Sequence, residues 1–188
     1  MTREHVFAHW LVAKTHASRL VSARAPDAPR ISRVIATVCA DCNAGWMSGL
    51  EVSFRRLAFA RARVGPIAPV DRTTLARWFT KTAALLADAN GLPLVPRDAL
   101  PALRTGMPDE VEVYLARRRR TPQRLDFALL PEADRVRSVS ITVDDLVAHV
   151  APSGTLAGRH GTRLWPLRTH TLRWDTLPVL PAAVMAAR

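Results

Sequence analysis

The stretch VCADCNAGWMSGLE, Val38–Glu51, decides how the first part of this chain folds. It holds the only two cysteines among the 188 residues, Cys39 and Cys42, and Asn43 follows directly. In a reducing compartment, such a C-x-x-C pair is more often metal-binding or redox-active than a structural disulfide. A structural zinc ion needs four ligands, and this pair supplies two. The other ligands must lie elsewhere, or the pair serves another purpose.

The residues on both sides of this stretch predict a strand and two helices. Arg30–Val38 is rich in β-branched residues, which favours a strand. Over residues 44–64 the apolar side chains recur at helical spacing and form a stripe of Trp46, Leu50, Phe54 and Leu57. A second helix is expected from a cap at Asp71 or Thr73 to about residue 89, where Asn90 and Gly91 end it. Its buried stripe consists of Leu75, Trp78, Phe79, Thr82, Leu85 and Leu86.

The second half of the chain changes to the alternating patterns of β-strands. Pro, Gly and Asp separate four such segments, which predicts an antiparallel meander of Glu110–Arg118, Arg124–Leu130, Val136–Val143 and Asp145–Ala151. Two shorter segments are expected to add edge strands, Arg163–Pro166 and Thr171–Trp174. The sequence therefore predicts an α+β fold in two parts. Residues 1–65 form an N-terminal module, and residues 66–188 form a domain of helix and antiparallel sheet.

The net charge indicates a polyanionic partner. Lys and Arg number 27 against 16 Asp and Glu, which gives a formal charge of +11. Such a charge attracts nucleic acid. The basic face of the first helix, made of Arg55, Arg56 and Arg63, is the expected contact, and plain solvation of these side chains is the alternative. The run Arg117–Arg120 is more often a solvated charge run than a contact.

The chain carries no signal for a membrane. It has no run of about 18 apolar residues, so no membrane span is expected. Its first residues contain no apolar stretch of signal-peptide length. These observations predict a cytoplasmic protein.

The start of the chain carries groups suited to phosphodiester hydrolysis. A water molecule must lose a proton near neutral pH, a task that suits His5. A divalent cation needs hard oxygen ligands, such as the carboxylate of Glu4 and the amide of Asn43. Neighbouring side chains on a strand point to opposite faces, so Glu4 and His5 can share a site only at a strand end or a bend. Asn43 lies at the start of a helix, which also favours phosphate.

Two motifs, EHVFAHWL at Glu4–Leu11 and VCADCNAGWMSGLE at Val38–Glu51, resemble the HNH endonucleases. They match the branch with the pattern EHxxPxWL followed by CxxCNxGWMSxLE. LARWFTKTAALL at Leu75–Leu86 looks like that group's W-x-x-K-T-A helix, and RLWP and TLRW are similar to its C-terminal strands. The resemblance implies a ββα-metal module at residues 1–65. It also implies hydrolysis of phosphodiester bonds in DNA, with RNA as the other candidate substrate.

The resemblance assigns roles to five residues. It makes His5 the general base and Glu4 a ligand of the catalytic cation, Mg²⁺ or Mn²⁺. It makes Asn43 the second polar ligand of that cation or the group that orients it. Cys39 and Cys42 become half of a structural Zn²⁺ site that clamps the strands to the helix.

The chain departs from the family pattern before Glu4. Zinc-bearing members carry a first C-x-x-C pair there, and this sequence has none. A start codon placed inside the true gene is the favoured explanation. The others are a decayed zinc site and replacement ligands, His9 and His16. Without the first pair, a catalytically inactive relative that binds nucleic acid or protein is the alternative function. Thiol redox chemistry is less favoured, because no Pro-Gly or aromatic context surrounds the cysteines.

Overall fold

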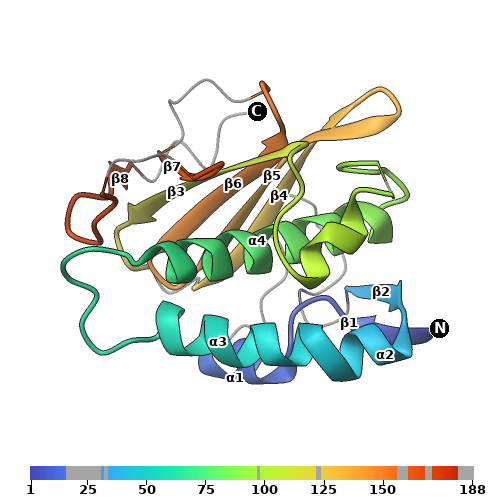
Figure 1. Cartoon of the computed structure of the whole chain (residues 1–188), viewed down its shortest axis with the longest axis horizontal. Helices are drawn as coiled ribbons and strands as arrows, with labels where there is room; N and C mark the ends of the chain where they lie inside the picture. Colours follow the sequence, from blue (N-terminus) through green and yellow to red (C-terminus); the bar gives the residue numbers. More distant parts are fainter. Residues whose placement is uncertain are drawn as a thin grey trace.

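The structure is a computed structural model, and it describes residues 1–15, 31, 34–96, 98–121, 124–155, 161–167 and 171–181. These residues contain helices and largely antiparallel sheets, so the predicted α+β class is confirmed (Figure 1). The elements are, in chain order, β1 (Thr2–His5), α1 (His9–Thr15), β2 (Ile35–Val38), α2 (Ala40–Cys42), η3 (Asn43–Met47), α3 (Ser48–Ala58), α4 (Pro69–Ala89), η4 (Leu100–Arg104), β3 (Val111–Arg118), β4 (Leu125–Glu132), β5 (Arg135–Val143), β6 (Leu146–Pro152), β7 (Thr162–Trp165) and β8 (Val179–Leu180).

The larger sheet comes from the second half of the chain. Its order is β4-β5-β6-β3-β7, and β8 pairs with β3 in parallel while the other pairs are antiparallel. The four predicted strands all form, but the predicted meander holds only for β4, β5 and β6. β3 lies on the far side of β6 instead of beside β4. β3 and β6 are buried along most of their length, which suits central strands, whereas β4 is half-buried and forms an edge.

The two predicted edge strands have different outcomes. Arg163–Pro166 falls largely on β7, which borders β3 at an edge of the sheet as expected. The strand predicted at Thr171–Trp174 is wrong, because this segment pairs with the connection before α4. Leu172 accepts a hydrogen bond from the Ile67 amide, and the Trp174 amide donates to Gly65. Only a single bridge, between Pro66 and Arg173, results.

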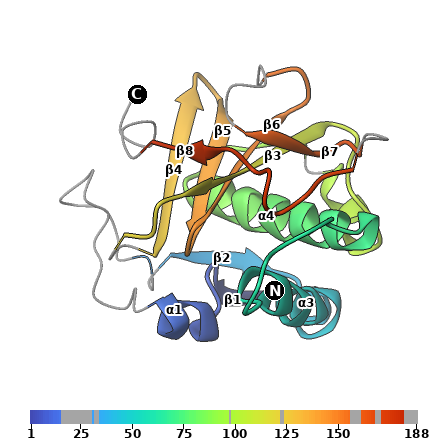
Figure 2. The ribbon, with the colours of Figure 1, turned by 90° about the vertical axis from the view of Figure 1, so that its left-hand side faces the viewer.

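Helix α4 is the central layer of the molecule. One side covers the large sheet, and the other side faces α3 and the small β1–β2 sheet (Figure 2). Because both sides are covered, its buried surface is wider than the predicted stripe and also includes Ala76, Ala83 and Ala87. The helix begins at Pro69 rather than at a cap by Asp71 or Thr73, since Ala68 is extended and proline suits the first turn. Within the described residues, no helix combines the length and apolar character needed to cross a membrane.

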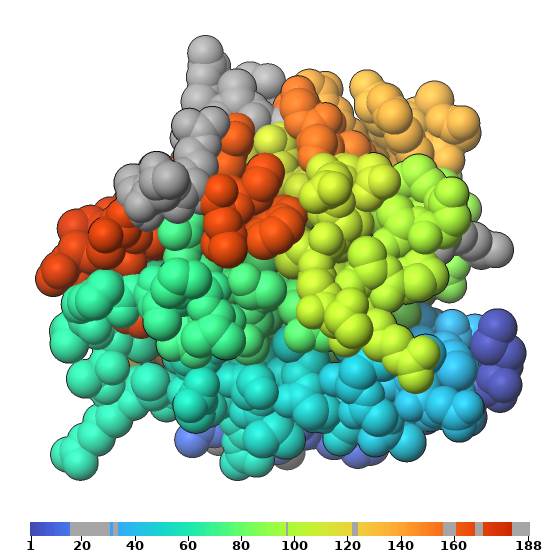
Figure 3. All heavy atoms as spheres, viewed as in Figure 1, coloured from blue at the N-terminus to red at the C-terminus, as the bar shows by residue number. Residues whose placement is uncertain are grey.

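Helix α3 packs on α4 through aromatic side chains. The rings of Phe54 and Trp78 stack with centroids 3.6 Å apart, and Phe79 meets both edge-on. In the space-filling view, the layer of α2 to α3 lies directly beneath α4 (Figure 3). The helix ends at Ala58 and not near residue 64 as predicted. Beyond that end, the Arg63 guanidinium donates a hydrogen bond of 2.8 Å to the Ala58 carbonyl.

A single buried cluster contains side chains from both predicted parts of the chain. It includes Val6, Phe7 and Leu11 from the first part and runs through α4 to the strands of the large sheet. The two-part division at residue 65 stays a prediction.

Candidate functional site

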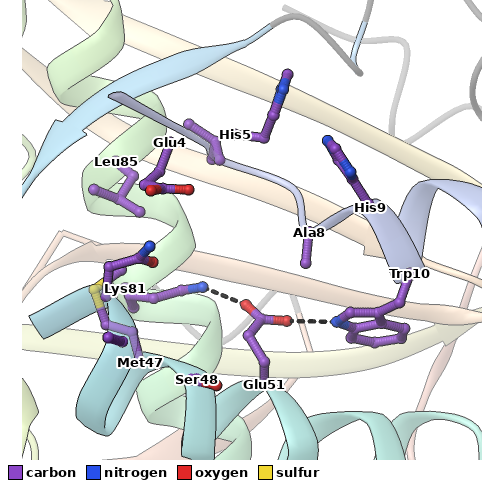
Figure 4. A pocket seen from close by; sticks show the side chains of 13 residues that line it. Glu4, His5, Ala8, His9, Trp10, Met47, Ser48, Glu51, Lys81 and Leu85 are labelled. Carbon is purple, nitrogen blue, oxygen red and sulfur yellow. Dashed lines mark hydrogen bonds and ion pairs between the residues drawn. The ribbon is translucent and has the colours of Figure 1, made fainter. Parts of the chain in front are cut away.

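The small sheet places the first candidate residues. Strand β1 runs antiparallel to β2, with Glu4 opposite Ala36 and His5 opposite Ile35. His5 is the last residue of β1, and the chain then turns into α1. Glu4 and His5 both border one cavity. Their side chains leave the strand in different directions: Figure 4 shows the Glu4 carboxylate toward Lys81 and Leu85, and the His5 ring on the other side of the strand, next to His9.

The cavity has a volume of about 440 Å³, within the range of small-ligand sites. It lies between β1, α1, η3, α3 and α4, and its ionisable and amide side chains are Glu4, His5, His9, Asn43, Glu51 and Lys81. The structure therefore brings together Glu4, His5 and Asn43, although Asn43 follows the other two by almost forty residues. Glu4 and Asn43 are half-buried, and His5 is exposed.

Asn43 owes its position to an irregular helix start. After Cys39 the chain makes one α-helical turn, α2, and continues into η3, which Asn43 begins and which is kinked. Gly45 interrupts the helical geometry, with φ −92° and ψ −110°. The kink sets the direction of the first turns separately from that of α3.

His9 lies beside His5 at the cavity. The centroids of the two imidazole rings are 4.7 Å apart, and both residues are exposed. In Figure 4 the two rings lie together on the side of the cavity opposite Glu51. Sequence analysis named His9 only as a replacement zinc ligand, whereas the structure places its ring next to that of His5. His16, the other replacement ligand, lies outside the described residues.

Glu51 ties three helices together at the cavity. Its Oε1 accepts hydrogen bonds from Lys81 Nζ at 2.5 Å and from Trp78 Nε1 at 2.8 Å. Its Oε2 accepts one from Trp10 Nε1 at 3.2 Å. The side chains of Lys81 and Glu51 are only 5% and 16% exposed, so this is a largely buried ion pair. Figure 4 shows Glu51 between Lys81 and Trp10.

Sequence analysis assigned no role to Glu51 or Lys81. Both residues lie inside the motifs that carry the resemblance, and both sit beside the apolar stripes of their helices. A carboxylate next to Leu50 and an ammonium between Trp78 and Thr82 are unusual on buried helix faces, because buried charges need partners. Two opposite charges on buried helix faces predict an ion pair between the two helices. This pattern in the sequence could have identified Glu51 and Lys81.

The cysteine pair lies close to the cavity in sequence. Cys39 is exposed and directly follows β2, Cys42 is half-buried, and both thiols are free. Hydrogen bonds from the backbone N–H and the thiol of Cys42 hold the pKa of the Cys39 thiol below its usual value. The two cysteines lie on the short stretch that leads from β2 through α2, three residues apart.

The donor sets fit the two expected metals differently. Among the described residues, no group of three or more His, Cys, Asp or Glu side chains is arranged to hold a metal ion. Cys39 and Cys42 thus supply two thiols and do not by themselves fit a closed zinc site of four ligands. Glu4 and Asn43 provide hard oxygen atoms at one cavity, which suits a magnesium or manganese ion that also keeps water ligands.

The three predicted basic contacts do not share one face. Arg55 and Arg56 are exposed on α3. The Arg55 guanidinium lies 5.4 Å from the centre of the Trp10 ring, and Arg56 pairs with Asp71 at 3.3 Å. The prediction that Arg63 continues this face is wrong, because α3 ends before it. Its buried guanidinium instead pairs with Asp145.

Comparison with protein-family models, with curated proteins and with solved structures found no match to this chain. The resemblance to HNH endonucleases therefore rests on the sequence motifs.

Proposed function

We propose that this protein is a metal-dependent endonuclease that hydrolyses phosphodiester bonds in DNA at the cavity between β1, η3 and α4. One observation carries the proposal. Glu4, His5 and Asn43, the three residues to which the HNH resemblance assigns the chemistry, line the same cavity from distant parts of the chain. The net charge of +11 supports a polyanionic substrate.

In this proposal each residue has a separate task. His5, exposed at the end of β1, takes the proton of the attacking water, because an imidazole accepts protons near neutral pH. Glu4 and Asn43 hold the divalent cation through their oxygen atoms. When bound, Mg²⁺ or Mn²⁺ neutralises charge that develops on the phosphate and on the leaving oxygen. The Glu51–Lys81 pair holds α3 against α4 and so fixes the wall of the cavity.

Cleavage of supercoiled plasmid tests the assignment of the base. With Mg²⁺ or Mn²⁺ the wild-type protein should nick or cut the plasmid, and His5→Ala should reduce the rate by ~10²–10⁴-fold. His9→Ala is the matched control, because its ring lies 4.7 Å from that of His5 in the same cavity. It should keep most of the activity.

The results of this cleavage assay distinguish His5 from His9 as the base, and a nuclease from a binding module. Equal cleavage by wild type and His5→Ala, purified in the same way, would show that His5 is not the base. Loss of activity in His9→Ala alone would move that role to His9. Binding of DNA without cleavage under all metal conditions would favour the alternative function, a binding module without catalysis.

A further inference from the structure

The turn between β5 and β6 buries two neighbouring carboxylates among arginines. Asp144 pairs with Arg120 at 3.1 Å and with Arg124 at 2.8 Å. Asp145 pairs with Arg117 at 2.7 Å and also with Arg63. Both aspartate side chains are 3% exposed. Two negative charges therefore anchor four positive ones, and the cluster keeps an excess of positive charge.

The arginines of this turn are not equally buried. The side chain of Arg63 is 7% exposed, whereas those of Arg117, Arg124 and Arg120 are 37%, 30% and 70% exposed. Each of these three uses part of its guanidinium to bind a buried carboxylate. Because a guanidinium has five N–H donors in a fixed plane, donors remain for an outside acceptor. The aspartates thus hold the arginines in place and leave their outer edges open.

Contacts connect this turn to the proposed active site. Arg124 donates a hydrogen bond of 3.4 Å to the carbonyl of Lys14, at the end of α1. The Lys14 ammonium lies 6.0 Å from the centre of the Phe59 ring, and Phe59 meets Trp10 edge-on. Trp10 borders the cavity and carries Arg55 over its ring. Figure 2 shows α1 beneath the ends of β4 and β5, where this turn lies.

The length of this path suits a nucleic acid backbone. Helix α1 begins at the cavity with His9, and Lys14 follows about 8 Å along the helix axis at 1.5 Å per residue. On one strand of a duplex, phosphates follow one another at about 3.4 Å of rise. Laid along the duplex axis, the helix therefore covers about two nucleotide steps between the cavity and the first arginine of the turn.

We propose that Arg55, Lys14, Arg124 and Arg120 form a basic track that binds backbone phosphates of DNA beside the cavity, with Asp144 as the positioning residue of Arg120 and Arg124. The track rests on DNA being the partner in the proposed function, but it does not depend on cleavage. It also replaces Arg63 in the predicted contact surface, since the Arg63 side chain is buried against Asp145.

Fluorescence anisotropy with a labelled DNA duplex of about 30 base pairs tests the track. EDTA is present, so that binding is measured without cleavage. The Arg120→Ala/Arg124→Ala variant removes two contacts. Each lost phosphate contact weakens binding about 8-fold at 0.1 M salt, so the dissociation constant should rise roughly 60-fold. The slope of log K against log salt should become shallower by about 1.8.

A matched control removes the same charge elsewhere on the sheet. Arg135 and Arg137 are exposed at the start of β5, while the turn at Asp144 follows its end, about 26 Å away along the strand. The Arg135→Ala/Arg137→Ala variant should bind almost as tightly as wild type. A charge-preserving variant, Arg120→Lys/Arg124→Lys, guards against a mere loss of folding. It should keep most of the affinity, and circular dichroism should show native helix and sheet.

Three results would overturn the track. Equal weakening by the two Ala variants would mean that only total charge matters. Unchanged binding by Arg120→Ala/Arg124→Ala would mean that DNA does not reach this turn, although plasmid cleavage by that variant would leave the nuclease proposal standing. Absence of DNA binding by wild type at low salt would overturn the track and the proposed substrate together.

Discussion

Replacing Glu51 with Gln should destabilise the fold, because it leaves the buried Lys81 ammonium without a negative partner. Trp78 and Trp10 donate to different oxygens of Glu51, so the single oxygen of Gln can accept from one of them; the change removes the charge and one indole hydrogen bond. The Lys81 side chain is only 5% exposed, so water solvates its positive charge poorly. The fold must then hold an uncompensated charge or release a proton from Lys81.

The distance in the structure sets the magnitude. Lys81 Nζ and Glu51 Oε1 are 2.5 Å apart. At an effective dielectric constant near 20, such a pair gains about 7 kcal/mol, and desolvation offsets much of it. Breaking one partner of a buried pair costs about 3–5 kcal/mol in comparable cases. We expect about 3 kcal/mol for Glu51→Gln, because Gln keeps a polar acceptor. For a chain of this size the melting temperature should fall by about 6–12 °C.

Urea unfolding, followed by tryptophan fluorescence, measures these free energies. Lys81→Met should cost less, about 1–2 kcal/mol, because Glu51 keeps both indole donors and some contact with water. The double variant should be no less stable than Lys81→Met within about 0.5 kcal/mol, since the unpaired ammonium is then absent. Glu132→Gln is the surface control, because its pair with Arg135 is exposed and should change stability by under about 0.5 kcal/mol. Additive losses in Glu51→Gln and Lys81→Met would refute the reasoning.

Two further predictions concern acid and metal. Burial alone would raise the pKa of the Asp145 carboxyl, but the hydrogen bond from Arg117 and the charge of Arg63 outweigh it, so that pKa lies below its usual value. The stability from Asp145 is therefore present above its unfolded pKa of about 3.9 and is lost as the pH falls through the folded pKa. Urea midpoints measured from pH 6 to pH 2 should fall less steeply in Asp145→Asn than in wild type, and equal slopes would contradict this. The second prediction concerns zinc. The protein should bind zinc weakly through Cys39 and Cys42, so dialysis against a chelator should remove the metal. A full, chelator-resistant equivalent of zinc would show that the missing ligands are already present.

Most elements of the fold could be predicted because their signals are local. The stripe of α4 and the alternation of β3 to β6 depend on spacing within each segment, and both appear where the sequence placed them. The position of β3 beside β6 could not be predicted in this way. Strand order depends on pairing between distant segments, and the local patterns of β3 and β4 do not distinguish their neighbours. What distinguishes them is that β3 is buried nearly throughout while β4 is only half-buried.

The end of α3 was mispredicted for the same reason, as the position of Arg63 shows. Helical periodicity continued past Ala58, so the sequence placed Arg63 on the basic face of a longer helix. The partner that decides its position is Asp145, 82 residues later in the chain. Glu51 was missed for a similar reason, because the donors that surround it come from α1 and α4. Glu4, His5 and Asn43 were nominated through the motifs, and their shared cavity became visible only in the structure.

Two buried ion pairs tie the wall of the cavity to α4 and to the large sheet. Glu51–Lys81 joins the start of α3 to the middle of α4, and Arg63–Asp145 joins the segment after α3 to the turn between β5 and β6. Between them, the rings of Phe54 and Trp78 stack across the same helix interface. Helix α3 and the segment after it are thus held by residues of α4 and of the turn between β5 and β6. Since η3 leads directly into α3, the position of Asn43 relative to His5 depends on these contacts. The large sheet and α4, which carry none of the proposed catalytic groups, therefore fix the geometry in which those groups meet.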